Sequence, residues 1–287
     1  MAGANMKDIK NRIKSVESTM QITKAMELVA SSKLRKARER VENSRAYFNT
    51  LYAALVDISR SNTDLSSPYV IQRPIKKVCY VLIAGDRGLA GGYNSNVFKA
   101  VTAHMDNREV CVLPIGKKAV EYCERRGWEI LSRDFMIAES VTFDDCDSIA
   151  QILCKGYLNG DFDEICVGYT NFISMLSQTP VVMSVLPMAS SKKDETKVDV
   201  KAKNLIVYEP DAETVFDSII PDYLAGIVYG SLSRSWVSEL AARRTAMDAA
   251  SKNAAEMIES LSLSYNRARQ GAITQEITEI VAGSGNE

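Results

Sequence analysis

A seven-residue apolar repeat runs through the first 60 residues and constrains the fold more than any other feature of the sequence. From Ile9 to Ile58 one series of positions steps alternately by four and three residues, and twelve of its fifteen members are apolar. Such a repeat keeps one seam of an α-helix facing a partner helix. Neither proline nor glycine occurs between Ala4 and Pro68, so we predict one long helix over residues 1–60.

The seam becomes polar at Thr23 and Glu27, where Ile22, Met26 and Val29 form a second apolar stripe on another face. A helix that is apolar on two faces needs two partners. We expect the paired helix to cover one face, and another protein or a second copy of the chain to cover the other.

Residues 212–287 are predicted to form a second long helix. Its seam is rich in small residues, which lets two helix axes approach closely, and consists of Leu240, Arg243, Met247, Ala250, Ala254, Met257, Leu261, Ser264, Ala268 and Gly271. Neither helix can bury its stripe alone, so we predict a long antiparallel coiled coil, because the segment between them returns the chain. Two ordinary helices of a bundle are the alternative.

Apolar runs and helical segments alternate in residues 75–208, which predicts an α/β domain with a Rossmann-like, mostly parallel sheet. Strands are expected at residues 76–84, 109–115, 128–135, 164–169, 181–186 and 205–208, and helices at 94–105, 117–126 and 145–158. Linkers are expected at 59–74 and at 190–203, the second as a loop or hairpin.

The turn after the first strand, residues 84–94, is a glycine-rich segment of the kind that can bind phosphate. It lacks the Gly-Lys-Ser/Thr of a P-loop, and its glycines do not follow the G-x-G-x-x-G spacing. No acidic residue ends a second strand where it could hold a ribose. We therefore predict a tight turn that caps a helix, with a dinucleotide-dependent enzyme as a competing hypothesis.

Groupings of catalytic or metal-binding residues are otherwise missing from the sequence. The single histidine, His104, is flanked by helical residues and is expected on a solvated face. Asp144, Asp145 and Asp147 fall where a helix should begin, a position that negative charge stabilises. The six cysteines contain no C-x-x-C pair, which argues against a zinc site and for a reducing compartment. We predict no catalytic residue, cofactor or metal.

Charge is distributed unevenly along the chain. Residues 1–60 carry 12 Lys and Arg against 6 Asp and Glu, a net charge of +6, whereas residues 211–287 carry 6 against 11, a net charge of −5. A basic arm favours an anionic partner, so a nucleic-acid-binding coiled coil is a second hypothesis. No apolar run approaches the ~20 residues that span a bilayer, and the first residues resemble neither a secretory signal nor a transit peptide.

Several motifs occur in a fixed order along the whole chain. They are MKDIKNRIK at 6–14, QITKAMELVASSKL at 21–34, DRGLAG at 86–91 with Tyr93 and Asn94, and the stretches 238–253 and 266–281. Together these motifs resemble the γ subunit family of F-type ATP synthases, and the C-terminal stretches are similar to the family signature nearly residue for residue.

The resemblance implies a rotary central-stalk subunit. Its coiled coil would lie inside a hexamer of three α and three β subunits, and its middle domain beside ε and above the ring of c subunits. Proton or sodium flow would turn the ring and this chain, which would force the catalytic β sites in turn to bind, make and release ATP. No side chain of this subunit would do chemistry, no nucleic acid would bind, and only the ring would link the chain to the membrane.

The resemblance also assigns residues to contacts. Those expected opposite an acidic loop of β are Lys24, Met26 and Lys33. Those expected to couple the C-terminal helix to β are Arg269, Gln270, Thr274 and Glu276. Those expected to face the c ring and ε are Tyr208 and Glu209. The chain lacks the inserted paired-cysteine segment of plant-type chloroplast members, which favours a bacterial enzyme on the cytoplasmic face of the plasma membrane.

Overall fold

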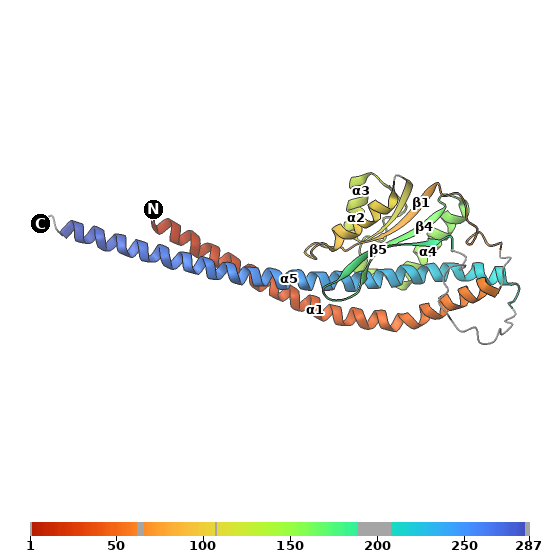
Figure 1. Ribbon diagram of the computed structural model, residues 1–287, viewed down its shortest axis with the longest axis horizontal. Coiled ribbons are helices and arrows are strands. Elements are labelled where there is room, and N and C mark those ends of the chain that lie inside the picture. The colour runs from red at the N-terminus through yellow and green to blue at the C-terminus, as the bar shows by residue number, and fades with distance from the viewer. Residues whose placement is uncertain (1, 62–65, 107, 189–207, 285–287) are drawn as a thin grey trace. The chain divides into compact units, whose positions relative to one another are not determined.

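The computed structural model describes residues 2–61, 66–106, 108–188 and 208–284 (Figure 1). The chain divides into two compact units, one of residues 1–32 with 243–287 and the other of residues 33–242. The predicted linker 190–203 and residues 205–207 of the predicted last strand lie outside the described residues.

Helix α1 runs from Ala2 to Ser61, as the seven-residue repeat predicts. The repeat marks its least exposed face, whose buried members are Thr23, Ala30, Leu34, Ala37, Leu55 and Ile58. The other members whose side chains are described are half-buried. Ile22 and Val29 of the second stripe are each 57% exposed, so no described residue covers this stripe.

Helix α5 runs from Ala212 to Ser284 and contains Pro221 near its start. Its predicted seam is confirmed at Leu240, Met247 and Ala254, which are buried. Beyond Ala254 the prediction is wrong at every second member. The exposed residues there are Met257, Ser264 and Gly271, and the half-buried residues next to them are Ile258, Tyr265 and Ala272.

The physical reason for this error is that apolar side chains occupy adjacent positions in this part of α5. A helix completes a turn every 3.6 residues, so a seam drifts slowly around it, and a seam displaced by one residue is a close competitor. Met257 and Ile258 are both apolar, and Tyr265 rather than Ser264 marks the observed seam.

In the first unit, residues 2–32 of α1 and 243–284 of α5 run in opposite directions (Figure 1). The hydroxyl oxygens of Thr23 and Ser251 lie 2.7 Å apart, and Ala30, Met247 and Ala254 are buried. The second long helix thus gives Thr23, a polar member of the α1 repeat, a hydrogen-bonding partner.

The second unit contains a five-stranded sheet with the order β3-β2-β1-β4-β5. Its strands are β1 Lys77–Ile83, β2 Glu109–Ile115, β3 Glu129–Ile130, β4 Glu164–Phe172 and β5 Gln178–Leu186. The first four strands are parallel and β5 is antiparallel to β4. The predicted strand 128–135 is too long: β3 has two residues, because the chain turns away at the polar residues 132–134.

Both faces of the sheet are covered (Figure 1). Helices α2 (Tyr93–Met105) and α3 (Lys117–Arg126) pack on one face, and α4 (Phe143–Asn159) with the first part of α5 packs on the other. A short 3-10 helix, η1, spans Ala138–Ser140. Because side chains alternate along a strand, Tyr80 of β1 faces α2 and Val81 faces α5, and the whole strand reads as a continuous apolar run.

Candidate functional site

An open groove of about 600 Å³ lies in the first unit. Its lining residues are Met20, Gln21, Lys24, Ala25 and Leu28 of α1 and Asp248, Ser251, Lys252 and Ala255 of α5. Two ion pairs flank it, Lys24–Glu27 and Lys252–Asp248, each with a nitrogen–oxygen distance of 2.8 Å. The hydrogen bond to Glu27 raises the pKa of Lys24, and Asp248 adds to the effect. The predicted coupling residue Lys24 is therefore a cation paired with Glu27 of its own helix.

Met26, the second predicted coupling residue of this helix, is half-buried. Its neighbours Ile22, Leu28 and Val29 are exposed by 57%, 62% and 57%. Contiguous exposed apolar side chains of this kind mark an interaction surface. Of the predicted stripe, Ile22 and Val29 are therefore exposed, whereas Met26 is half-buried.

The predicted C-terminal coupling residues Arg269, Gln270, Thr274 and Glu276 are all exposed. The Thr274 hydroxyl donates to the carbonyl oxygen of Gln270 at 2.9 Å, within the helix. Exposed apolar residues continue this surface toward the end of α5, namely Ile273 (48%), Ile277 (57%), Ile280 (70%) and Val281 (64%).

The structure does not bring the two groups of coupling residues of the first unit together. Lys24 lies opposite Asp248 and Lys252, and Arg269 follows Lys252 by 17 positions on the same helix. At 1.5 Å per residue this separation is about 25 Å along α5. The first unit therefore presents two separate contact zones.

Lys33, the third predicted contact of α1, belongs to the second unit, where its ammonium is 2.5 Å from the carboxylate of Glu139 in η1. Both side chains are almost half exposed, so the pair contributes little to stability. The sequence predicts a lysine available to another protein, whereas the structure shows it bonded within the chain.

Tyr208 and Glu209, the predicted foot residues, precede α5. Tyr208 is half-buried against the main core of the second unit, and Glu209 is exposed. Asp211 then begins the helix by accepting the Thr214 amide at 2.8 Å, and this bond lowers the pKa of Asp211. Of the two predicted residues, only Glu209 presents its side chain fully to solvent.

The glycine-rich turn after β1 is held by the carboxylate of Asp86. This carboxylate accepts the backbone amides of Lys117 (3.2 Å), Ala138 (2.8 Å) and Glu139 (3.2 Å). The Lys117 amide opens helix α3, where a doubly wound fold would present free amides to a phosphate. The Asp86 carboxylate therefore occupies the amides that could otherwise bind a phosphate at this edge of the sheet. This supports the predicted tight turn over the hypothesis of a dinucleotide-dependent enzyme.

Gly85 at the same edge lies directly against helix α5. A Cβ built at Gly85 would be 2.7 Å from a carboxylate oxygen of Glu239, which is only 8% exposed. The carboxyl end of β1 is thus filled by a side chain of α5, and glycine permits this close approach.

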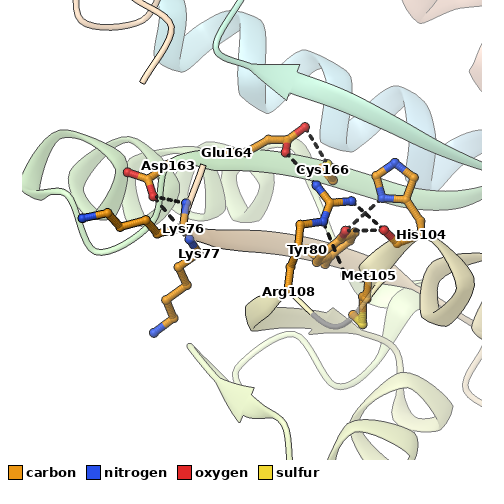
Figure 2. A network of polar contacts seen from close by, with 9 residues as sticks. All are labelled: Lys76, Lys77, Tyr80, His104, Met105, Arg108, Asp163, Glu164 and Cys166. Carbon is orange, nitrogen blue, oxygen red and sulfur yellow. Dashed lines mark hydrogen bonds and ion pairs between the residues drawn. The ribbon is translucent and has the colours of Figure 1, made fainter. Parts of the chain in front are cut away.

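Figure 2 shows the opposite, amino-terminal edge of the sheet, where His104 lies. The Nδ1 of His104 is 2.9 Å from the hydroxyl of Tyr80, and the two rings meet edge to face. His104 is half-buried, so the expectation of a solvated face is only partly met. Burial of Tyr80 raises its pKa to about 12.

Arg108 connects this edge to the end of α2. It donates to the carbonyl oxygens of His104 (2.6 Å) and Met105 (3.3 Å) and pairs with the buried Glu164 of β4 at 3.4 Å (Figure 2). Cations near the C-terminus of a helix satisfy its free carbonyl groups. The network therefore joins α2 to the sheet, and each of its charged groups has a structural partner.

The acidic cluster begins helix α4, as predicted. Thr142 and Asp145 form a capping box, in which each side chain bonds the other residue's backbone amide. No group of three or more potential ligands for a metal ion occurs in the described ranges. In those ranges, too, every helix is too short or too polar to cross a bilayer.

The sequence analysis did not identify three residues that contact Lys33, Gly85 and Thr23 from distant parts of the chain. Glu139, Glu239 and Ser251 each act through a residue far away in the chain. The one available signal was the polar break of the apolar repeat at Thr23, which calls for a polar partner when buried.

The sequence is similar to those of known proteins over almost its whole length. The ATP synthase family model, which describes the family as "ATP synthase", matches residues 5–285. An "ATP synthase gamma chain" from Ruminococcus albus is 47% identical, with 99% of each chain covered. An "ATP synthase gamma chain, sodium ion specific" from Acetobacterium woodii is 41% identical, with 98% of each chain covered.

Solved structures share the fold. A chain of the Euglena gracilis mitochondrial ATP synthase matches with a TM-score of 0.68 at 17% identity, over 99% of this chain and 94% of that one. A chain of the Tetrahymena thermophila central stalk and c ring matches with a TM-score of 0.60 at 24% identity, over 80% and 99%. These matched chains share the long helices and the α/β domain of this chain. The chain belongs to the ATP synthase gamma-chain family.

Proposed function

We propose that this chain is the rotary central-stalk subunit that transmits torque between an ion-driven c ring and the catalytic β subunits. It would thereby couple transmembrane flow of protons or sodium ions to ATP synthesis and hydrolysis. The observation that carries the proposal is the exposure of apolar residues in two zones of the first unit, Ile22 and Val29 on α1 and Ile273, Ile277 and Ile280 on α5. Such surfaces require a surrounding protein.

The packing of the first unit fits an antiparallel coiled coil, and the strand order of the second unit fits a Rossmann-like domain. A coiled coil with one apolar stripe on one helix and charged residues around it presents a different surface in each direction. Subunits around it would then bind each rotational position with a different free energy. Coupling of this kind is a difference in contact energy between states and needs no catalytic side chain or cofactor.

Seven residues would make these contacts with the β subunits. They are Lys24, Met26 and Lys33 opposite an acidic loop, and Arg269, Gln270, Thr274 and Glu276 at the C-terminal zone. Exposure of Arg269, Gln270, Thr274 and Glu276 supports their assignment. Lys33 would exchange its bond with Glu139 for a carboxylate of β.

The partners would be three α and three β subunits, the ε subunit and the c ring, with Tyr208 and Glu209 near the last two. The chain would be peripheral to the cytoplasmic face of a bacterial plasma membrane and attached through the ring. The nucleic-acid hypothesis loses support because Lys24 and Lys33 of the basic arm are paired with carboxylates of the same chain.

Reconstitution tests the proposal directly. The purified chain is mixed with α and β subunits of the same organism, and ATP hydrolysis and single-molecule rotation are recorded with and without it. We expect rapid hydrolysis and unidirectional rotation only when the chain is present. Equal hydrolysis in its absence, or hydrolysis without rotation in its presence, would overturn the proposal.

A further inference from the structure

Strand β4 extends beyond the end of its neighbour β1. The last residue pair of these strands is Leu82 with Gly168, and β4 continues to Phe172. Backbone groups of alternate residues face the same neighbouring strand. Thr170, two residues after Gly168, therefore turns its amide and carbonyl groups toward a position where β1 is no longer present.

Two serines of helix α5 take the place of the missing strand. The amide of Thr170 donates to the Ser235 hydroxyl at 3.0 Å. The Ser238 hydroxyl shares its proton between the Thr170 carbonyl oxygen at 3.1 Å and the carbonyl oxygen of Arg234, one turn earlier in α5, at 2.8 Å. Ser235 is 1% exposed and Ser238 is fully buried. Positions three apart lie on one face of a helix, so both bonds arise from one side of α5.

A third residue on this face, Glu239, presses against Gly85 at the end of β1. Val237, Leu240 and Ala241 meanwhile pack with Leu34 and Ala37 of α1. Apolar contacts are non-directional and tolerate sliding, whereas hydrogen bonds fix distance and angle. The polar contacts are therefore the ones that define the rotational position of α5 on the sheet.

We propose that Ser235 and Ser238 form a polar clamp, through their two hydrogen bonds to the Thr170 backbone, that fixes helix α5 to the sheet so that both turn as one body. The clamp rests on the proposed rotary function, because it would let torque applied to the α/β domain reach α5 without slippage. Ser235 and Ser238 are positioning residues that contact no other subunit in this role.

The clamp is tested first by hydrogen exchange on the full chain. In the Ser235→Ala/Ser238→Ala variant we expect the Thr170 amide to exchange about tenfold faster, as a loss of roughly 1.4 kcal/mol in opening free energy produces. Ser231→Ala/Ser233→Ala, which removes two other buried hydroxyls of α5, should leave Thr170 unchanged. Ser235→Thr keeps the hydroxyl that accepts the Thr170 amide and should restore protection relative to Ser235→Ala. Unchanged exchange in the double variant overturns the clamp; should that variant not fold, Ser235→Ala alone is compared with Ser235→Thr.

The mechanical role is tested in the reconstituted complex. All six native cysteines are buried, so Lys155→Cys on the exposed side of α4 provides a selective site for a rotation probe on the sheet. We expect the angular distribution of the probe during each pause to widen in the Ser235→Ala/Ser238→Ala variant and not in the Ser231→Ala/Ser233→Ala control. Equal widths overturn the clamp even when exchange at Thr170 rises.

The two proposals fail in different ways. Absence of rotation with the unsubstituted chain contradicts the rotary function, and hydrogen exchange still decides whether the clamp bonds exist. Rotation of the unsubstituted chain with an unaltered distribution in the double variant contradicts only the clamp.

Discussion

The hydroxyl oxygens of Thr23 and Ser251 lie 2.7 Å apart between the two helical segments of the first unit, and both residues are less than 10% exposed. Thr23 also donates to the carbonyl oxygen of Met20 at 3.0 Å. The Ser251 hydroxyl therefore donates to Thr23. A single buried polar pair in an otherwise apolar seam specifies which turns of two helices face each other.

A double-mutant cycle measures this pair. Thr23→Val leaves Ser251 without its acceptor, and Ser251→Ala leaves Thr23 without its donor, so we expect each to lower the free energy of unfolding by about 1 kcal/mol. The double variant should lose clearly less than the sum, as determined by urea unfolding. Thr19→Val is the matched control, because Thr19 makes the same bond to its own helix but is exposed. Additive losses would show that the pair is not coupled.

Charge reversal tests the C-terminal contact zone. We expect Arg269→Glu to lower the number of ions pumped per ATP hydrolysed by more than it lowers assembly of the complex, since the residue is exposed and its role is contact with β. Arg267→Glu carries the same charge change on an exposed neighbour outside the predicted set. Proton pumping in vesicles, normalised to hydrolysis, gives the comparison, and equal coupling in the two variants contradicts the assignment.

Met26→Lys tests the N-terminal zone in the same assay. A second cation beside Lys24 would attract the acidic loop of β more strongly in one rotational state than in others, so hydrolysis should persist while pumping falls. Met26→Leu keeps the apolar volume and serves as the control. A normal pumping ratio for Met26→Lys is the contradictory result.

Gly116→Ala should destabilise the second unit severely. Its φ is +95°, and an added Cβ would be 2.2 Å from the carbonyl oxygen of Ala84, a contact that only backbone movement can relieve. We expect a loss of more than about 3 kcal/mol or failure to fold. Gly127→Ala is the matched control: its φ is +68° but the space is open, so it should lose only about 1 kcal/mol. Thermal unfolding of both variants measures the two losses of stability, and similar losses would disprove the steric explanation.

Alkaline pH should unfold the second unit through its buried thiols. Burial raises the pKa of Cys123, Cys146 and Cys166 to about 12, from an ordinary value of 9.0. A group whose pKa is higher in the folded state contributes stability that is complete below its unfolded pKa and is lost as pH rises through the folded pKa. We therefore expect the free energy of unfolding to fall between pH 9 and about pH 12.

Urea unfolding at a series of pH values checks this window. Cys166→Ala removes one of the groups and should show a shallower fall above pH 9. Native thiols should also react with a disulfide reagent at pH 8 only as fast as the chain opens, because all six are buried. Stability that stays constant from pH 9 to 11 contradicts the prediction.

Thr170→Val should stabilise the chain. The Thr170 hydroxyl is buried and has no hydrogen-bonding partner within the described residues, so replacing it with a methyl group removes a desolvated polar atom while keeping β-branching. We expect a gain of about 1 kcal/mol in the free energy of unfolding. Thr179→Val in β5, at an exposed position, should change it by less than about 0.5 kcal/mol. A loss of stability in Thr170→Val would mean that the hydroxyl is satisfied.

The long helices and most of the strands could be predicted because their signals are local. The alternation of four- and three-residue steps in α1 and the continuous apolar run of β1 are each complete within one segment. The end of the α5 seam was displaced by one residue, because apolar side chains such as Met257 and Ile258 occupy adjacent positions there. The antiparallel direction of β5 was equally unmarked, since its sequence is compatible with either direction.

The candidate site divides in the same way. The apolar stripe of Ile22, Met26 and Val29 follows from a single-helix pattern, whereas the Arg269 zone was expected only from the family resemblance. The bond of Lys33 with Glu139 and the contact of Tyr80 with His104 join residues 106 and 24 positions apart. No local pattern specifies such partners.

The sequence alone determined which faces of the helices and strands are apolar, because hydrophobic periodicity is a property of each segment by itself. The tertiary structure alone decided where the polar groups at those faces find partners. The Thr170 backbone forms hydrogen bonds with Ser235 and Ser238 because β4 extends beyond the end of β1 and α5 packs at that position. Glu239 of the same helix contacts Gly85. Hydrogen bonds depend on distances and angles between distant segments, and those are fixed only when the chain is folded.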